Sequence, residues 1–118
     1  MEQGVDTSGA AKLEAGFAKL RERFVEGLEE REEEFLNLLE VLNDPAQTEA
    51  SADGIRAHAH KLHGLSGTLG YARLGSLAAQ LEHHIDLILA GPRPLETGFL
   101  TELLDALLDE IQNILDDA

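Results

Sequence analysis

The fold is decided by a long periodic stretch, residues 13–42, which reads LEAGFAKLRERFVEGLEEREEEFLNLLEVL. Its apolar side chains recur at steps of three, four or seven residues, which places them on one face of a helix. They are Leu13, Phe17, Leu20, Phe24, Leu28, Phe35, Leu38 and Leu42. Thr7 or Ser8 is the expected cap at the start, and Asn43-Asp44-Pro45 is expected to end the helix, because a residue before proline disfavours the helical conformation. Residues 1–8 are then expected to form a flexible N-terminus.

Three more amphipathic helices follow from the same kind of pattern. The second is expected to begin near Thr48 and run towards Thr68, with Gly70 as the break. The third has its apolar stripe between Leu74 and Ile88 and ends before Gly91-Pro92-Arg93-Pro94, and the fourth has its stripe between Phe99 and Leu115. An amphipathic helix on its own leaves its apolar stripe exposed to water, so the four helices must pack against one another. We therefore predict an all-α fold, an antiparallel up-and-down four-helix bundle that forms a single domain over residues 1–118.

The composition limits the function. Hydrophobic residues make up 43% of the 118 residues and aromatic residues only 4%, which suits one helical core. Nine basic against 23 acidic side chains give a net charge of −14, which argues against nucleic acid and anionic membranes as partners. No cysteine is available for a disulfide or a metal site. With no apolar run of about 20 residues and no secretory signal, a cytoplasmic protein is expected.

The second predicted helix carries a histidine on its outer side. At roughly 100° of rotation per residue, Ile55, Ala59, Leu62, Ser66 and Leu69 share the buried face, and His60 points roughly 140° away from Ile55. Gly64 and Gly67 fall on either side of its direction. A glycine inside a helix costs up to about 1 kcal/mol relative to alanine, so two on one face need a reason. Access for a bulky partner is one; close helix packing, or a helix that ends near Gly64, is the other.

The segment from His60 to Gly70, HKLHGLSGTLG, followed by Leu74, Leu77, Leu81 and Glu82, resembles the signature of histidine-containing phosphotransfer (HPt) domains of bacterial two-component phosphorelays. In that family a His is followed by a Leu two residues later, commonly by a Lys and then a Gly, with a small residue and a second Gly downstream. The resemblance is detailed over residues 57–82. It implies a four-helix bundle with an exposed phosphoacceptor histidine.

The resemblance also implies roles for individual residues. His60 accepts the phosphoryl group, a choice that agrees with the free lone pair of a neutral imidazole. His63 stands where the family usually has lysine, so its positive charge depends on pH. Arg56 is the first candidate to supply the missing charge, and Lys61 the second. Glu82, at the edge of the third helix's stripe, is expected to hydrogen-bond the acceptor imidazole, a role for which Gln80 points too far off.

The partners implied are a histidine kinase or hybrid kinase and a response-regulator receiver domain, with Mg²⁺ expected on the receiver and no cofactor in this chain. No Gly-rich nucleotide loop is present, so the chain is expected to carry a phosphoryl group without an ATP-binding kinase domain of its own. The family resemblance implies a monomer, although the stripe from Leu13 to Leu42 is long enough to extend past the bundle.

Two other classes of function stay open. One is a metal-binding bundle that uses His58, His60, His63, His83 and His84, although these side chains diverge around their helices. The other is a bundle that binds receiver domains without transferring phosphoryl groups. His58 itself falls on the apolar flank and is expected to be a packed histidine.

Overall fold

The chain forms four helices. The structure, a computed structural model, describes the backbone of residues 3–118 and the side chains of residues 9–118. The helices are α1 (Gln3–Val41), α2 (Thr48–Ser66), α3 (Ala72–Ala90) and α4 (Gly98–Asp117), and residues 3–118 contain no strand. The prediction of an all-α fold is confirmed.

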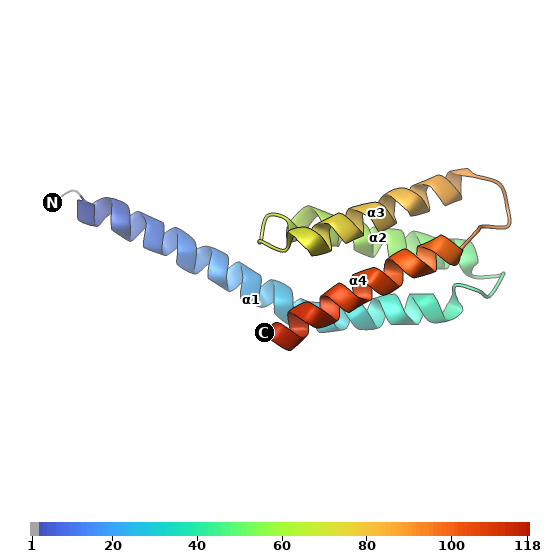
Figure 1. Cartoon of the computed structure of the whole chain (residues 1–118), viewed down its shortest axis with the longest axis horizontal. Coiled ribbons are helices and arrows are strands. Elements are labelled where there is room, and N and C mark those ends of the chain that lie inside the picture. Colours follow the sequence, from blue (N-terminus) through green and yellow to red (C-terminus); the bar gives the residue numbers. More distant parts are fainter. Residues whose placement is uncertain (1–2) are drawn as a thin grey trace.

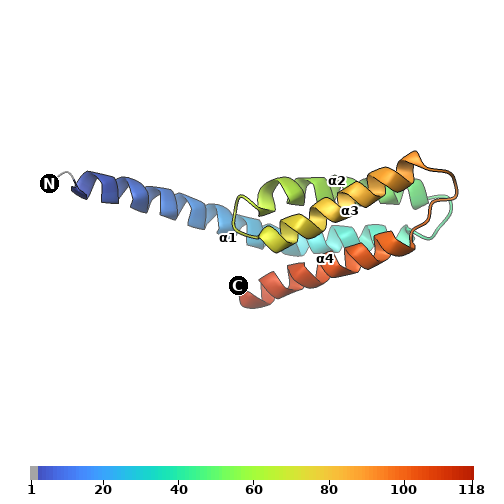
Figure 2. The same cartoon turned by 45° about the horizontal axis from the view of Figure 1, so that its top comes forward.

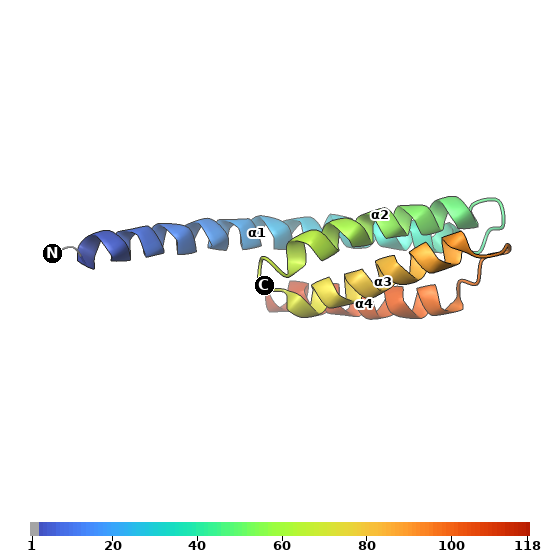
Figure 3. The same ribbon diagram turned by 90° about the horizontal axis from the view of Figure 1, so that it is seen from above.

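The helices pack as an up-and-down bundle. Each contacts the helix before and after it in the sequence, and α1 also contacts α4, so the bundle closes into a ring of four. Figures 1 and 2 show α2 and α3 on one side of the bundle and the second half of α1 with α4 on the other. Figure 3 shows the short connections at the two ends, which make neighbouring helices antiparallel.

The helix α1 starts earlier than the sequence predicts. It begins at Gln3, so the expectation of a cap at Thr7 or Ser8 is wrong. The flexible N-terminus over residues 1–8 stays a prediction, and residues 1 and 2 lie outside the described part of the chain. No proline interrupts this stretch, and Ala10 and Ala11 favour continuation of the helix. The first half of α1 extends well beyond the bundle (Figure 1), and the molecule is 68 Å long.

The core is aliphatic and is built from one stripe of each helix. The stripe predicted for α2 is buried throughout, and α1 contributes Leu28, Phe35 and Leu42. At Gly54 a Cβ atom would lie only 3.1 Å from Leu38 Cδ2, so the glycine lets α1 and α2 approach closely. The opposite faces of the helices are charged. None of the described helices combines the length and the apolar character that a membrane-spanning helix requires.

The turn between α2 and α3 is tightly defined. Gly70 has a φ of +94°, in the left-handed region that favours glycine. The Tyr71 N–H donates to the Ser66 carbonyl (2.8 Å) and the Gly70 N–H to the Gly67 carbonyl (3.2 Å), the two bonds of a Schellman motif. The predicted break at Gly70 is therefore present, and it fixes how α3 returns along α2.

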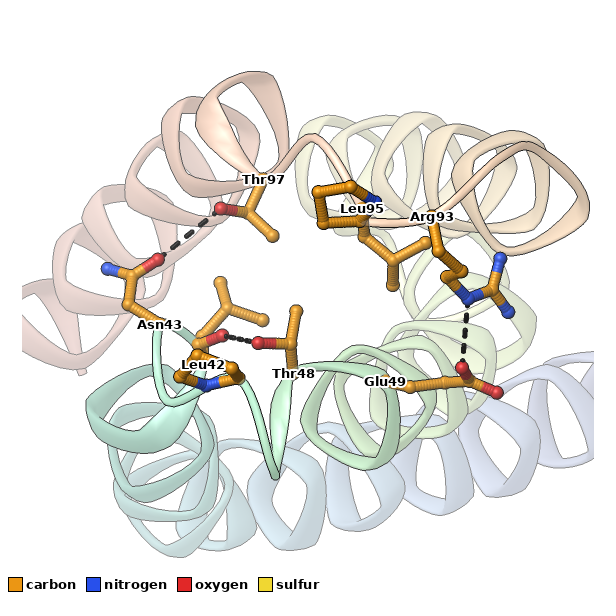
Figure 4. A pocket seen from close by; sticks show the side chains of 9 residues that line it. Leu42, Asn43, Thr48, Glu49, Arg93, Leu95 and Thr97 are labelled. Carbon is orange, nitrogen blue, oxygen red and sulfur yellow. Dashed lines mark hydrogen bonds and ion pairs between the residues drawn. The ribbon is translucent and has the colours of Figure 1, made fainter.

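The other end of the bundle holds the loops 42–47 and 91–97 around a hollow of about 640 Å³ (Figure 4). Three side-chain hydrogen bonds tie its walls together: Thr48 to the Leu42 carbonyl, Arg93 to Glu49, and Thr97 to Asn43. The single guanidinium in the lining is thus already engaged with a carboxylate. This hollow closes the bundle end and contains none of the histidines.

Candidate functional site

The helices α2 and α3 run antiparallel in a register that brings their polar residues face to face. A step of four along α2, from Arg56 to His60, matches a step of four back along α3, from Asp86 to Glu82. Further along, a Cβ on Gly75 would lie 3.4 Å from the backbone nitrogen of Gly67, so the two backbones approach closely there. The Schellman turn and this close approach together set the register.

His60 is the most exposed member of the site. Its Nδ1 lies 2.7 Å from Oε2 of Glu82, and the side chains of the two residues are 68% and 16% exposed. An ionised carboxylate can only accept hydrogen bonds, so Nδ1 of His60 must carry the proton. In the neutral ring the lone pair then lies on Nε2, the nitrogen that Glu82 does not contact. The contact expected between Glu82 and His60 is present.

Glu82 also holds a second imidazole, that of His63. Its Oε1 lies 3.1 Å from Nδ1 of His63, so one carboxylate orients both rings, each through its Nδ1–H. Partial burial of Glu82 opposes its ionisation, but the hydrogen bonds from His60 and His63 outweigh this and lower the pKa of its carboxyl below the ordinary value. Glu82 is therefore a fixed negative charge beneath two exposed rings.

The expected cations lie further from this centre. Arg56 Nε is 3.4 Å from Asp53 and 3.7 Å from Asp86, so its guanidinium already has two carboxylate neighbours. Lys61 is exposed on the adjacent side of α2. The structure thus brings His60, His63 and Glu82 together and leaves Arg56 and Lys61 at the periphery.

The two glycines beside His60 face open space. No atom lies within 4 Å of where a Cβ would stand on Gly64 or Gly67, so neither glycine is needed for helix packing at that position. The α-helix also continues past Gly64 to Ser66. Close helix packing through Gly64 and an early helix end are therefore both wrong, whereas the backbone of Gly67 does lie close to Gly75. The glycines leave the surface beside the imidazole open.

His58 serves a different purpose, as the sequence predicts. Its Nδ1 lies 2.7 Å from Arg31 Nη1, its Nε2 3.1 Å from Glu34, and its ring packs edge-on against Phe35. A guanidinium only donates, so Nδ1 accepts and Nε2 carries the proton. Burial lowers the pKa of His58 below the ordinary value, although Glu34 opposes the shift. His58 is a neutral, packed histidine between α1 and α2.

The remaining histidines do not join the site. His84 packs edge-on against Phe99 on the α3–α4 side, and His83 is exposed beside it. Over the described residues, no group of three or more His, Asp or Glu side chains is arranged to hold a metal ion. The structure thus offers no convergent set of ligands for the metal-binding alternative.

Comparison with known proteins assigns the family. The Hpt domain model matches residues 19–116, which is most of the chain. The chain belongs to the Hpt domain family. A search of curated proteins and a search of solved structures each gave no match. Membership of the Hpt family indicates histidine phosphotransfer in a phosphorelay, with kinases and receiver domains as the kinds of partner.

Two features of this Hpt domain escaped sequence reasoning. One is the sharing of Glu82 by His60 and His63, and the other is the pairing of Arg56 with Asp86. The sequence does contain a signal for the pairing of Arg56 with Asp86, because Arg56 and His60 have the same spacing of four residues as Glu82 and Asp86. This spacing predicts the pair only when the register of α2 against α3 is known.

Proposed function

We propose that this chain is a phosphorelay carrier that holds a phosphoryl group on Nε2 of His60, between a histidine kinase or receiver domain and a receiver aspartate. The observation that supports this most directly is the 2.7 Å contact between Nδ1 of His60 and Glu82. It leaves the lone pair of the neutral ring on the outward nitrogen, on a surface that Gly64 keeps open.

The transfer step needs no proton acceptor. The Nε2 lone pair attacks the phosphorus of an aspartyl phosphate, the N–P bond forms, and the P–O bond to the aspartate breaks and leaves a carboxylate. The Nδ1 proton stays in place, so the ring becomes a phosphorylated imidazolium. Glu82 faces the positive charge that develops, and because it is ionised beforehand it costs no reorganisation during the reaction. The same steps in reverse pass the group to a second receiver.

The chain supplies a nucleophile and a docking surface, and the partner supplies the rest. In phosphoryl transfer most of the catalysis is positioning and neutralisation of charge on the phosphoryl oxygens. We expect Mg²⁺ on the receiver to contribute to this neutralisation. His63, with its Nδ1 on Glu82, can donate from a protonated Nε2 to the phosphoryl oxygens, as lysine does elsewhere in the family.

The test is labelling by a phosphorylated receiver domain. Incubation with a cognate receiver is expected to give acid-labile, base-stable phosphate on the wild-type chain and none on His60→Gln. His83→Gln, an exposed histidine outside the site, is the matched control and should be labelled like wild type. Undiminished labelling of His60→Gln would exclude His60 as the acceptor.

The same assay separates transfer from simple binding. A bundle that only docks receivers would bind the receiver with both wild type and His60→Gln and would acquire phosphate in neither. Receiver binding without any phosphohistidine would therefore replace the proposal with that of an interaction module.

A further inference from the structure

The carboxylate of Glu82 prepares two imidazoles in the same way. Its Oε2 lies 2.7 Å from Nδ1 of His60, and its Oε1 lies 3.1 Å from Nδ1 of His63. An ionised carboxylate only accepts hydrogen bonds, so each ring carries a proton on Nδ1 and, when neutral, has its lone pair on Nε2. The side chain of His63 is 52% exposed, against 68% for His60. His63 therefore has both the tautomer and the exposure that a nucleophile requires.

The protonation state of His63 decides what its Nε2 can do. A protonated ring has a hydrogen on Nε2 and can donate it to a phosphoryl group on His60. A neutral ring has a lone pair at the same position and no hydrogen to donate. Both forms keep the Nδ1–H that faces Glu82, so the neutral form is held ready to attack an electrophile.

We propose that His63 is a second phosphoacceptor, which takes a phosphoryl group on Nε2 from phosphoramidates, small donors with a nitrogen–phosphorus bond. The Nε2 lone pair attacks the phosphorus and forms a new N–P bond. The N–P bond of the donor breaks, and its nitrogen, which enters protonated, leaves as ammonia. The Nδ1 proton stays in place, so the ring becomes a phosphorylated imidazolium that faces the negative charge of Glu82.

The size of the donor separates this reaction from transfer by a receiver. A small molecule reaches either ring from solvent. The aspartyl phosphate of a receiver has to be brought to the surface by docking, and the ring that it is expected to reach is the more exposed one, that of His60.

The other three histidines lack this arrangement. His58 has no free lone pair, because its Nδ1 accepts from Arg31 and its Nε2 donates to Glu34. Nε2 of His84 is buried beside Phe99. His83 is exposed, but within residues 9–118 no carboxylate is hydrogen-bonded to its ring. His83 is therefore a suitable reference for an exposed histidine without a carboxylate on Nδ1.

One carboxylate also limits the pair to one phosphoryl group at a time. Residues three apart on a helix are neighbours, with about 5–6 Å between Cβ atoms, so phosphoryl groups on His60 and His63 would repel each other. Glu82 has a single negative charge to set against one imidazolium. Phosphate on His63 is thus expected to keep His60 from accepting a second group. This consequence rests on the proposed function of His60, whereas the labelling of His63 does not.

The first experiment labels the whole chain with potassium phosphoramidate at about pH 8, at which imidazole is mainly neutral. Trypsin then separates the two acceptors, because Lys61 lies between them. The tryptic peptides are 57–61 with His58 and His60, 62–73 with His63, and 74–118 with His83 and His84. In wild type we expect phosphate on both of the first two peptides. In His60→Gln we expect it on 62–73 and not on 57–61.

The rates within one digest test the role of the carboxylate. In His60→Gln, peptide 62–73 should gain phosphate at least about tenfold faster than the peptide with His83, a ratio that one hydrogen bond to a charged group can supply. Adding Glu82→Ala removes the acceptor of the Nδ1 proton and should slow labelling of His63 to the rate of that reference peptide. Circular dichroism checks that both variants keep the helices.

Cleavage after arginine alone tests the mutual exclusion. It releases residues 57–73, which carry both acceptors on one peptide. In wild type this peptide is expected to carry one phosphate and never two, even after long labelling. A peptide with two phosphates would overturn the limit of one group per pair.

Three results would overturn His63 as an acceptor. They are the absence of phosphate from 62–73 in His60→Gln, equal labelling rates for this peptide and the His83 reference, and a rate that Glu82→Ala leaves unchanged. None of these measurements uses a receiver domain. Labelling of His60 by a phosphorylated receiver can therefore succeed or fail independently.

Discussion

One carboxylate is central to the chemistry that we propose for this Hpt domain. Glu82 is 16% exposed and accepts hydrogen bonds from Nδ1 of both His60 and His63. Because these bonds lower the pKa of Glu82 despite partial burial, it stays charged through neutral pH and holds both rings in one tautomer. A single acidic residue on α3 therefore decides which nitrogen of His60 is available.

Gly64 allows a direct test of access to His60. A Cβ at position 64 has no atom within 4 Å, and Gly64→Leu should raise the free energy of unfolding by about 0.5–1 kcal/mol, because leucine is a better helix former. We expect labelling of His60 by a phosphorylated receiver to slow at least about tenfold, since a side chain now stands beside the imidazole. Gly64→Ala gives a similar gain in stability with little bulk and should transfer nearly as fast as wild type. Equal rates for both variants would contradict the role of Gly64 in access.

We expect His63 to make transfer sensitive to pH. A lysine keeps its charge across the neutral range, whereas an imidazole loses its proton within it. We expect the ratio of the His63→Lys transfer rate to the wild-type rate to rise as the pH is raised from about 6 to about 8. The ratio cancels every effect of pH that both proteins share, and Glu82 stays ionised because its pKa is lowered. A constant ratio would show that His63 contributes no charge to the transition state.

At the scale of the elements, the packing of α1 against α2 includes a neutral histidine. His58 bridges Arg31 and Glu34 and contacts Phe35. Burial lowers its pKa in the folded chain, so the unfolded chain binds a proton at this position at a higher pH than the folded one does. The contribution of His58 to the free energy of unfolding must therefore fall as the pH drops through the ordinary range of histidine.

A variant isolates this effect. His58→Asn should be less stable than wild type at neutral pH, because it loses the bridge and the ring contact. The difference in free energy of unfolding between the two should shrink as the pH is lowered from about 7 to about 5, since only wild type pays to keep the ring neutral. Urea unfolding at several pH values measures it. A difference that stays constant would mean that His58 does not titrate differently in the two states.

The sequence predicted the helices well and the contacts between them only in part. Steps of three and four among Leu13, Phe17 and Leu20 predict a helix whatever that helix packs against. Gly70 predicts a turn because glycine adopts a positive φ without strain. The sharing of Glu82 and the position of Arg56 depend instead on how α3 is placed along α2. That placement follows from the close approach of Gly75 to Gly67, a contact between backbones that no periodicity reveals.

At the scale of the whole molecule, charge is the dominant feature. The segment 28–118 packs 18 acidic and five basic side chains onto one small bundle, so the folded state carries strong self-repulsion. Much of this repulsion acts between exposed groups, which dissolved salt screens.

Salt should therefore stabilise the bundle. Raising NaCl from about 0.01 M to about 0.15 M shortens the Debye length from about 30 Å to about 8 Å. We expect the melting temperature to rise by roughly 4 °C, corresponding to about 1 kcal/mol for a domain of this size. Differential scanning calorimetry measures the shift, with sucrose as an uncharged comparison. A melting temperature that falls with salt would mean that attractive ion pairs outweigh the repulsion.

The hairpin of α2 and α3 has a further consequence for how the protein acquires its activity. Donor and acceptor of the key hydrogen bond, His60 and Glu82, are only 22 positions apart, and α2 and α3 share the most extensive contact of any helix pair. Closing so short a loop costs little chain entropy, and contacts of this kind form early in folding. We therefore expect the proposed nucleophile and its carboxylate to be brought together by a local event, before α1 and α4 close over them.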